Sequence, residues 1–152
     1  NFISSAESPK DVSDVDDLSE LEGLDGIICG IPTWNTGADE ERSGTAWDSI
    51  LEDIGELSLS GKKVAIFGLG DSSTYTENYC DAMEELHSYF QKAGADMVGY
   101  VDKSSYTFEE SKSIIGESFC GLPLDEDSES DLTDSRLESW ASQLKGEIPS
   151  LG

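Results

Sequence analysis

The stretch Gly26-Ile-Ile-Cys-Gly-Ile31, followed by Pro32-Thr-Trp-Asn-Thr-Gly37, decides the fold class of this chain. Its first half is a short apolar run bounded by glycine and proline, which is typical of a parallel strand buried on both faces. A second run of this kind, Lys63-Val-Ala-Ile-Phe67, lies further along the chain. Residues 96–101 form a candidate third strand, and residues 119–122 form a shorter strand fragment. We therefore expect a parallel sheet.

Helical patterns alternate with these strands. The strongest predicts a helix over residues 78–93, with Gly94 in the C-cap region. Shorter helices are expected over residues 45–54 and 133–144, the last with Thr133 as its N-cap. Helices that follow parallel strands form right-handed crossovers, so the sheet should be covered on both faces. The apolar residues expected to face it are Trp47, Ile50, Leu51, Tyr79, Ala82, Met83, Leu86, Phe90, Leu137, Trp140, Ala141 and Leu144.

The charge balance narrows the range of partners. Of 152 residues, 33 are Asp or Glu and 9 are Lys or Arg, which gives a formal net charge of −24. Such a surface repels phosphate backbones and anionic lipids, and it favours basic protein partners. We expect neither nucleic-acid binding nor membrane insertion, since no apolar run approaches the roughly 20 residues of a membrane-spanning helix. The three cysteines are far apart, which favours a reducing compartment over a disulfide framework.

Both ends of the chain fall outside the alternating pattern. Residues 1–22 are polar and acidic, and we expect them to form a loosely held N-terminal arm. Residues 23–147 contain the strands and helices and form the domain, and residues 148–152 form a short tail. The first residue is Asn1 rather than methionine, so we expect a processed, trimmed or incomplete start.

Two loops should meet at the carboxyl ends of the strands, which is where open parallel sheets bind ligands. The first carries Trp34, and the second, residues 68–77, carries two glycines and Tyr75. Aromatic rings in these places can stack on a planar ligand. The alternatives are a tryptophan that covers the end of the sheet and an ordinary surface tyrosine. Gly68 and Gly70 do not make a dinucleotide fingerprint, because no third glycine opens the following helix.

The sequence assigns no catalytic residue and no metal ligand. Its sole histidine, His87, lies two helical turns from Cys80, and no further ligand clusters near this pair. The alternating acids of residues 125–131 lack the glycine and the closing glutamate of a calcium loop, so we expect a solvated acidic loop there. Cys29 should be a packing residue within its strand.

Several motifs together resemble the long-chain flavodoxins of algae and cyanobacteria. They are Pro32-Thr-Trp-Asn-Thr-Gly37, Val64-Ala-Ile-Phe-Gly-Leu-Gly-Asp71 and Tyr75-x-x-Asn-Tyr-Cys-Asp-Ala82. Phe108-Glu-Glu-Ser-Lys112 and Gly121-Leu-Pro-Leu-Asp-Glu-Asp127 extend the match, which runs from about residue 16 to residue 146. The former of these lies where a segment splits the last strand of long-chain flavodoxins. The resemblance implies a flavodoxin-like α/β three-layer sandwich with a parallel sheet.

The resemblance also implies a function. Flavodoxins bind FMN without a covalent bond and carry single electrons at low potential, so the chain would be an electron carrier rather than an enzyme. Trp34 and Tyr75 would sandwich the isoalloxazine ring, and the carbonyl between Asn35 and Thr36 would turn toward flavin N5. Backbone groups of residues 68–71 would meet the pyrimidine edge, and two polar side chains would support the loops. The residues expected at the cofactor are Thr33, Trp34, Asn35, Thr36, Gly37, Gly68, Leu69, Gly70, Asp71, Tyr75 and Asn78.

The resemblance further implies a first strand, a phosphate-binding loop and a first helix that are missing from these 152 residues. Three explanations stay open: the natural protein has a start that is absent here, the chain is an FMN-free structural or docking subunit, or another chain supplies the strand. The intact aromatic loops favour the first, whereas the acidic charge and the absent strand favour the second. A flavodoxin-related reductase would need a nicotinamide or quinone pocket, and no second cofactor motif is present.

Partners and location follow from the same resemblance. It implies docking to a basic surface on a redox partner such as photosystem I or a ferredoxin-NADP reductase, or stable membership of a photosystem I-type complex. The implied location is the plastid stroma or the stromal face of the thylakoid, with the bacterial cytoplasm as the alternative.

Overall fold

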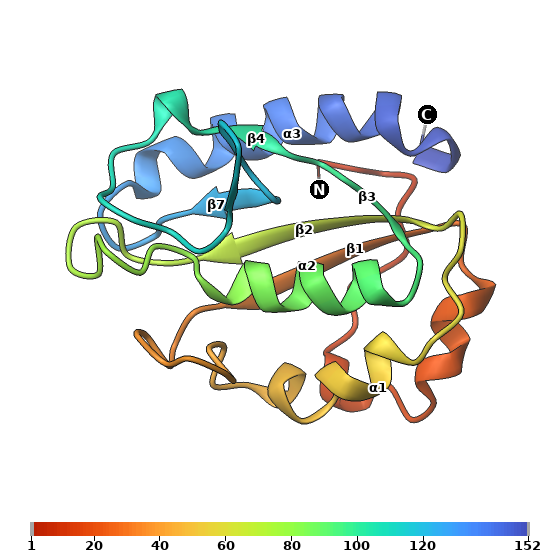
Figure 1. Ribbon diagram of the computed structural model, residues 1–152. Helices are drawn as coiled ribbons and strands as arrows, with labels where there is room; N and C mark the ends of the chain where they lie inside the picture. Colours follow the sequence, from red (N-terminus) through yellow and green to blue (C-terminus); the bar gives the residue numbers. More distant parts are fainter. Residues whose placement is uncertain (1, 152) are drawn as a thin grey trace.

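The computed structural model describes residues 2–151 and confirms a parallel α/β fold. Its main sheet contains β1 (Gly26–Pro32), β2 (Lys63–Leu69), β3 (Asp96–Val98) and β7 (Leu122–Leu124), and every pairing in it is parallel. The helix α3 (Thr133–Glu147) covers one face, while α1 (Leu51–Gly55) and α2 (Ala82–Lys92) lie on the other. The fold therefore has three layers (Figure 1).

A hydrophobic cluster fills the space on each side of the sheet. On the side of α2, the predicted stripe of Tyr79, Met83, Leu86 and Phe90 is fully buried. On the side of α3, Trp140 and Leu144 form the centre of a second cluster. Full burial of one large apolar side chain contributes roughly 1.5–3 kcal/mol, so these two clusters hold the layers together.

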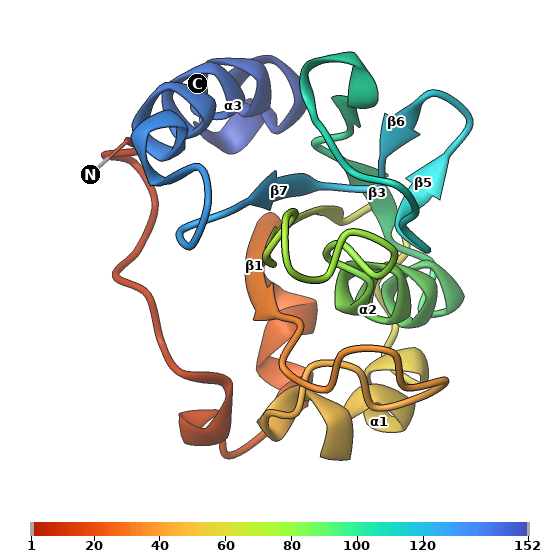
Figure 2. The same ribbon diagram turned by 90° about the vertical axis from the view of Figure 1, so that its left-hand side faces the viewer.

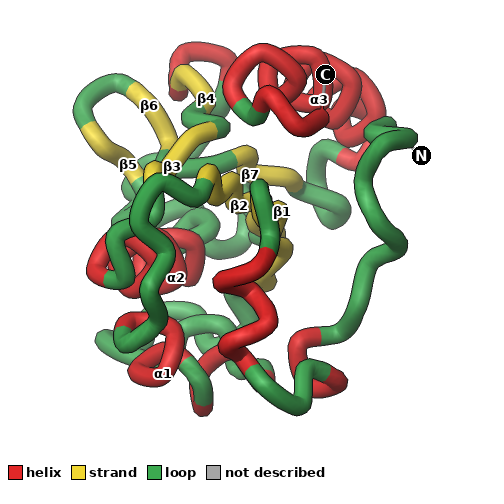
Figure 3. Tube along the Cα trace, turned by 90° about the vertical axis from the view of Figure 1, so that its right-hand side faces the viewer, coloured by secondary structure: helices red, strands yellow, loops and turns green. Residues whose placement is uncertain are grey.

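β1 is the end strand of the described sheet and is fully buried on one face only, which corrects the expectation of a strand buried on both faces. Its residues alternate between buried and half-buried, with Ile27, Cys29 and Ile31 buried. The reason is that the described N-terminal residues add no strand beside β1. They run at a distance from it (Figures 2 and 3), and an open cavity of about 1240 Å³ lies between the two.

The opposite edge of the sheet is made by two short strands placed end to end. β3 pairs with the first half of β2, and β7 pairs with its second half. Between them, residues 99–121 leave the edge and form a small antiparallel sheet of β4 (Val101–Asp102), β6 (Ser118–Phe119) and β5 (Ile114–Ile115). The strands expected over residues 96–101 and 119–122 are therefore each divided between two sheets.

Glycine explains where the chain leaves and rejoins the edge. Gly99 has a φ of 80°, and its carbonyl accepts a hydrogen bond from Trp140 Nε1 at 2.8 Å. That conformation disfavours other residues and turns the chain out of the sheet. Gly121 lies so close to β2 that a Cβ there would be 2.2 Å from the carbonyl oxygen of Ile66.

The helix boundaries differ in part from the predicted ones: α3 starts at Thr133 as expected but ends at Glu147 rather than at residue 144. α2 begins at Ala82 rather than at residue 78, because Cys80 has a φ of 54° and interrupts any helix before it. In α3, Thr133 is the first helical residue and not the N-cap, which is Leu132 without a side-chain hydrogen bond. The end of α2 follows the prediction: Gly94 has a φ of 91°, and its N–H donates to Gln91, as in a Schellman motif.

The remaining helical pieces are short. Of the helix expected over residues 45–54, only a 3₁₀ turn and α1 form, because residue 50 has a non-helical conformation between them. No helix within residues 2–151 is long and apolar enough to cross a membrane. The 3₁₀ helices are η1 (Val12–Asp14), η2 (Leu18–Gly23), η3 (Ala46–Ser49), η4 (Lys103–Ser105), η5 (Ser130–Leu132) and η6 (Pro149–Leu151).

Both ends of the chain lie against the domain. The half-buried side chains of Leu18 and Leu21 in η2 pack on the cluster beneath α2. Ser5 donates a hydrogen bond of 3.0 Å to the carbonyl oxygen of Leu151, which joins the N-terminal arm to the end of the chain. Ile148, directly after α3, is only 1% exposed and belongs to the cluster on that side of the sheet.

The close approach at Gly121 gives a test of the fold. Gly121→Ala should lower the free energy of unfolding by roughly 1–3 kcal/mol or more, because the new methyl group meets backbone that cannot rotate away. Gly146→Ala is the matched control, since Gly146 is in α3 with open space around it and alanine favours the helix by about 0.5–1 kcal/mol. Chemical denaturation measures both. Equal stabilities of the two variants would contradict this placement of Gly121.

Candidate functional site

The loops that follow β1 and β2 lie side by side at the carboxyl end of the sheet (Figure 2). The backbone N–H of Thr33 donates to the carbonyl oxygen of Leu69 at 3.1 Å and so continues the strand pairing into the loops. Each loop then presents one large aromatic ring to solvent: Trp34 is 74% exposed and Tyr75 is 50% exposed. Among residues 2–151, neither ring contacts another aromatic ring.

The first loop is a narrow hairpin. The N–H of Trp34 donates to the carbonyl of Ser43 at 3.2 Å, and the N–H of Asn35 donates to the carbonyl of Arg42 at 3.0 Å. At the tip, the Asn35 carbonyl accepts from Ala38 N–H at 3.2 Å, and Gly37 has a φ of 83°. The base of the hairpin is therefore bonded across its width, while its tip is a single tight turn.

Thr36 and Thr33 add side-chain bonds to this loop. The Thr36 hydroxyl donates to the Thr33 carbonyl at 3.2 Å, and the Thr33 hydroxyl accepts from Ala82 N–H at 3.2 Å. The second bond places the Thr33 side chain at the start of α2. Thr33 thus joins the first loop to the helix that follows the second.

The second loop is organised around Asp71. Its Oδ1 accepts from the backbone N–H of Ser73 and of Thr74, at 3.1 and 3.0 Å, and from the Ser128 hydroxyl at 2.9 Å. The backbone hydrogen bond from Thr74 is the main reason that the pKa of Asp71 is lower than usual. The carbonyl of Asp71 accepts from the N–H of Tyr75 at 3.0 Å, so the turn that presents the tyrosine ring is fixed at its start.

Three other predicted residues of this loop have structural contacts. A Cβ at Gly68 would lie 2.4 Å from the Met83 side chain, and one at Gly70 would lie 3.0 Å from Cys80. Both glycines are therefore required by packing against α2 and the turn before it. Asn78 closes the loop, since its N–H donates to the Tyr75 carbonyl at 3.0 Å and its side chain donates to Asp81 at 3.4 Å.

Asp125 corrects the expectation of a wholly solvated acidic loop, because its side chain is fully buried. It accepts from the N–H and the hydroxyl of Ser72, at 2.9 and 2.6 Å, and from the N–H of Asp127 and of Ser128, at 3.0 and 2.7 Å. Burial disfavours the charged carboxylate, but these hydrogen bonds outweigh burial and lower its pKa. The sequence signal was the Asp-x-Asp-Ser order, in which an aspartate binds the amides two and three residues on.

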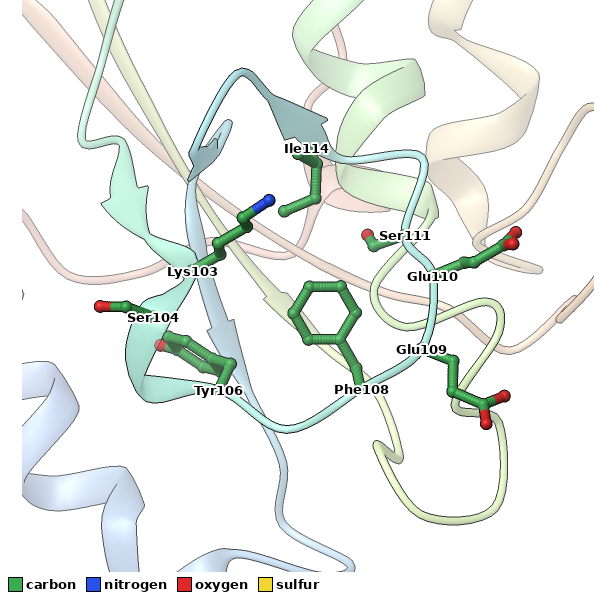
Figure 4. A pocket seen from close by; sticks show the side chains of 8 residues that line it. All are labelled: Lys103, Ser104, Tyr106, Phe108, Glu109, Glu110, Ser111 and Ile114. Carbon is green, nitrogen blue, oxygen red and sulfur yellow. The ribbon is translucent and has the colours of Figure 1, made fainter.

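The segment of residues 99–121, which lies between β3 and β7 in the sequence, also supports the second loop. The N–H groups of Glu109 and Glu110 donate to the carbonyl of Thr76 at 2.9 and 3.0 Å, and the Lys112 N–H donates to the Asp81 carboxylate at 2.8 Å. A separate open cavity of about 600 Å³ lies within this segment (Figure 4). Its lining residues are Lys103, Ser104, Tyr106, Phe108, Glu109, Glu110, Ser111 and Ile114.

The chemistry available at the two loops is stacking and hydrogen bonding. His87 is buried on α2, where its Nε2 lies 2.6 Å from the Tyr100 hydroxyl, and burial lowers its pKa. Burial raises the pKa of the Cys29 and Cys120 thiols to about 12, so neither is a thiolate near neutral pH. Within the described residues, the two loops offer exposed aromatic rings for stacking and backbone groups for hydrogen bonding.

Comparison with known proteins decides the family. Residues 4–140 match the family model for flavodoxin. The flavodoxin of Synechococcus elongatus is 41% identical over 122 residues, which cover 80% of this chain and 69% of that protein. Flavodoxin 2 of Escherichia coli is 39% identical over 124 residues, with 80% and 69% covered. The chain belongs to the flavodoxin family.

Solved structures of flavodoxins agree with this membership. The crystal structure of Fusobacterium nucleatum flavodoxin bound to flavin mononucleotide superposes with a TM-score of 0.78 at 31% identity, covering 85% of this chain and 75% of that one. Flavodoxins are electron-transfer flavoproteins and not enzymes that turn over a substrate.

Asp125 gives a test of how the second loop is held. Asp125→Asn should lower the free energy of unfolding at pH 7 by about 1–3 kcal/mol, because an amide cannot accept all the hydrogen bonds that the carboxylate accepts. Asp127→Asn is the matched control, since this neighbouring carboxylate is exposed. Denaturation of both variants and of the native protein measures the difference.

The difference in stability between the native protein and Asp125→Asn depends on pH. Because the pKa of Asp125 is lowered on folding from the ordinary value of 3.8, its contribution is complete above that value and is lost as the pH falls below it. The stability gap between the native protein and Asp125→Asn should therefore narrow below about pH 3.8. A gap that is absent at pH 7, or that widens in acid, would contradict the role given to Asp125.

Proposed function

We propose that this protein is a long-chain flavodoxin that binds FMN non-covalently between Trp34 and Tyr75 and carries single electrons at low potential. The observation that carries the proposal is the pair of exposed, unstacked rings on neighbouring loops at the carboxyl end of a parallel sheet. Burying an exposed ring against a flat ligand is favourable, and two such rings on opposite sides define a slot for one planar group. When bound, FMN supplies the ring that accepts and releases electrons.

The proposal assigns a separate task to the tip of the first loop. The Asn35 carbonyl now accepts from Ala38 N–H, so pointing it at the flavin ring requires this bond to break and the peptide to rotate. Gly37 has a positive φ of 83° and no atom within 4 Å of its Cβ position, which leaves room for that rotation. Asn35 and Thr36 would thereby offer a hydrogen-bond acceptor when the flavin carries a proton at N5.

Backbone groups after β2 are assigned to the pyrimidine edge of the ring. The Gly70 N–H already donates to the Leu124 carbonyl at 3.0 Å. Other backbone groups of residues 68–71 would therefore meet the pyrimidine edge of the flavin, and the Asp71 amide would donate a hydrogen bond to it. Thr33 and Asn78 hold the two loops by the bonds described above and need not touch the ligand.

Negative charge around the loops supports a low potential. The exposed acids Asp39, Glu40 and Glu41 belong to the first loop, and the whole chain has a formal charge of −24. Nearby negative charge disfavours an added electron on the ring, and aromatic walls exclude the water that would screen it. The assigned residues thus tune and position a redox group without acting as acid, base or nucleophile.

The same charge supports a basic docking surface on the redox partner. Complementary charge accelerates encounter and makes it sensitive to salt. We propose photosystem I or a ferredoxin-NADP reductase as such partners, with the plastid stroma or the stromal face of the thylakoid as the location and the bacterial cytoplasm as the alternative. The FMN-free structural subunit gains no support from the relatives, which are flavodoxins.

The proposal is tested by removing the two rings. Trp34→Ala and Tyr75→Ala should each weaken FMN binding roughly 10-fold, and the double variant more, because a stacked aromatic pair contributes about 0.5–1.5 kcal/mol beyond its buried area. Riboflavin should lose affinity by the same factor, since both rings contact the isoalloxazine and not the phosphate. Quenching of flavin fluorescence measures these affinities.

Phe2→Ala is the matched control for this experiment. Phe2 is also an exposed aromatic residue, at 38%, but it lies on the N-terminal arm. Its removal should leave both affinities unchanged. Unaltered FMN binding in the Trp34→Ala, Tyr75→Ala double variant would overturn the assignment of the two rings.

A further inference from the structure

Glu85 on α2 binds the far side of the hairpin that carries Trp34. Its side chain is 9% exposed, although it is a carboxylate on the helix surface. One oxygen accepts from the backbone N–H of Glu41 at 2.8 Å, and the other accepts from the N–H of Arg42 at 2.7 Å. Two consecutive backbone amides of the loop are thus held by one side chain that lies 43 residues further along the chain.

Arg42 completes a reciprocal clamp on the same helix. Its side chain is buried, and Nη1 donates to Glu84 Oε2 at 2.6 Å and to the Asp81 carbonyl at 3.3 Å. Nη2 donates to the Asp39 carbonyl at 3.0 Å, within the loop itself. A buried guanidinium is costly unless it is paired, so this loop can occupy its position only while α2 supplies acceptors.

The clamp holds a strained residue. Glu41 has a φ of 55°, in the left-handed region that residues with a Cβ disfavour. Such conformations persist only where the surroundings fix them. The hydrogen bond from the Glu41 N–H to Glu85 is the contact that fixes this one.

The two clamped residues in turn hold Asn35. The Arg42 carbonyl accepts from the Asn35 N–H, and the Glu41 carbonyl accepts from Asn35 Nδ2, each at 3.0 Å. The next residue, Ser43, accepts from the N–H of Trp34 at 3.2 Å. The chain of contacts therefore runs from Glu85 through residues 41–43 to the two residues that face the proposed ligand.

We propose that Glu85 is a positioning residue that fixes the base of this hairpin, so that Trp34 is held in place while only the peptide after Asn35 and the tip at residues 36–38 reorient. The inference deepens the proposed function and rests on it for the effect on FMN, but the clamp itself is a property of the protein without ligand. It divides the loop into a fixed part, which sets the position of the ring, and a movable part, which contains the peptide after Asn35.

Glu85→Gln tests the clamp with little change of shape. A glutamine side chain has one acceptor oxygen and a donor amide, so one of the two loop N–H groups loses its acceptor. Glu40→Gln is the matched control: Glu40 is an exposed glutamate of the same loop, so the change removes one negative charge without removing an acceptor of the clamp. Residue-resolved hydrogen exchange of the Trp34 and Asn35 amides, without flavin, reports on the hairpin directly.

In Glu85→Gln these two amides should exchange about 10-fold faster than in the native protein, since loss of a buried acceptor costs roughly this factor in local stability. In Glu40→Gln they should exchange at close to the native rate. Amides in the middle of α3 should be unaffected in both variants, which separates a local opening from a general loss of stability. If Glu85→Gln does not fold, Glu85→Asp is measured instead, because one methylene less prevents the carboxylate from reaching both amides.

FMN binding is then measured on the same variants, so that failure of the clamp can be distinguished from failure of the proposed function. Faster exchange with weaker FMN binding in Glu85→Gln supports the proposal in full. If the amides of Glu85→Gln exchange faster but the native protein does not bind FMN, the clamp is supported and the proposed function is contradicted. Unchanged exchange at Trp34 and Asn35 overturns the clamp, whatever the affinity for FMN.

Discussion

Seven consecutive residue pairs, from Gly26 with Lys63 to Pro32 with Leu69, join β1 and β2 in parallel and determine the position of everything at the carboxyl end of the sheet. Because the strands run in the same direction and end in register, the loops after them must begin next to each other. The hydrogen bond from Thr33 to Leu69 extends this register by one residue into the loops. The loops that carry the two exposed rings are neighbours for this reason, although 41 positions separate Trp34 from Tyr75 in the sequence.

Buried carboxylates hold the loops in a chain whose acidic residues are mostly solvated. Within residues 2–151, the buried acidic side chains are Asp81, Glu85 and Asp125. Each accepts backbone N–H groups from a segment at or beside the aromatic loops: residue 112, residues 41–42, and residues 72, 127 and 128. A charged acceptor strengthens such hydrogen bonds, so a strongly acidic composition here serves local order as well as long-range attraction.

The features that the sequence predicted correctly are those set by local periodicity. The apolar runs of β1 and β2, the buried stripe of α2 and the glycine after that helix all depend on residues within a few positions of each other. The start of α2 was wrong because a positive φ at Cys80 is imposed by its surroundings and not by its residue type. The division of the sheet edge between β3 and β7 depends on which part of β2 each segment reaches, and no local pattern encodes that.

The residues of the candidate site likewise include some that the sequence pattern indicates and others that only the fold reveals. Trp34 and Tyr75 are candidates from the sequence, since large aromatics in glycine-containing loops are conspicuous, and the structure shows that both side chains are exposed. Glu85 is not such a candidate, because a glutamate on a helix is indistinguishable from a solvated charge, and the turn signal that Asp125 carries does not show that its side chain is buried. Only the fold brings Asp125 to Ser72 and Glu85 to Arg42.

The central claim is that these loops hold a flavin, and the absorption spectrum of the protein as isolated tests it most directly. We expect the paired near-ultraviolet and blue bands of bound flavin, at close to one flavin per chain, and their restoration by FMN after the flavin has been removed. A protein that lacks these bands, and that does not acquire them when FMN is added, would contradict it.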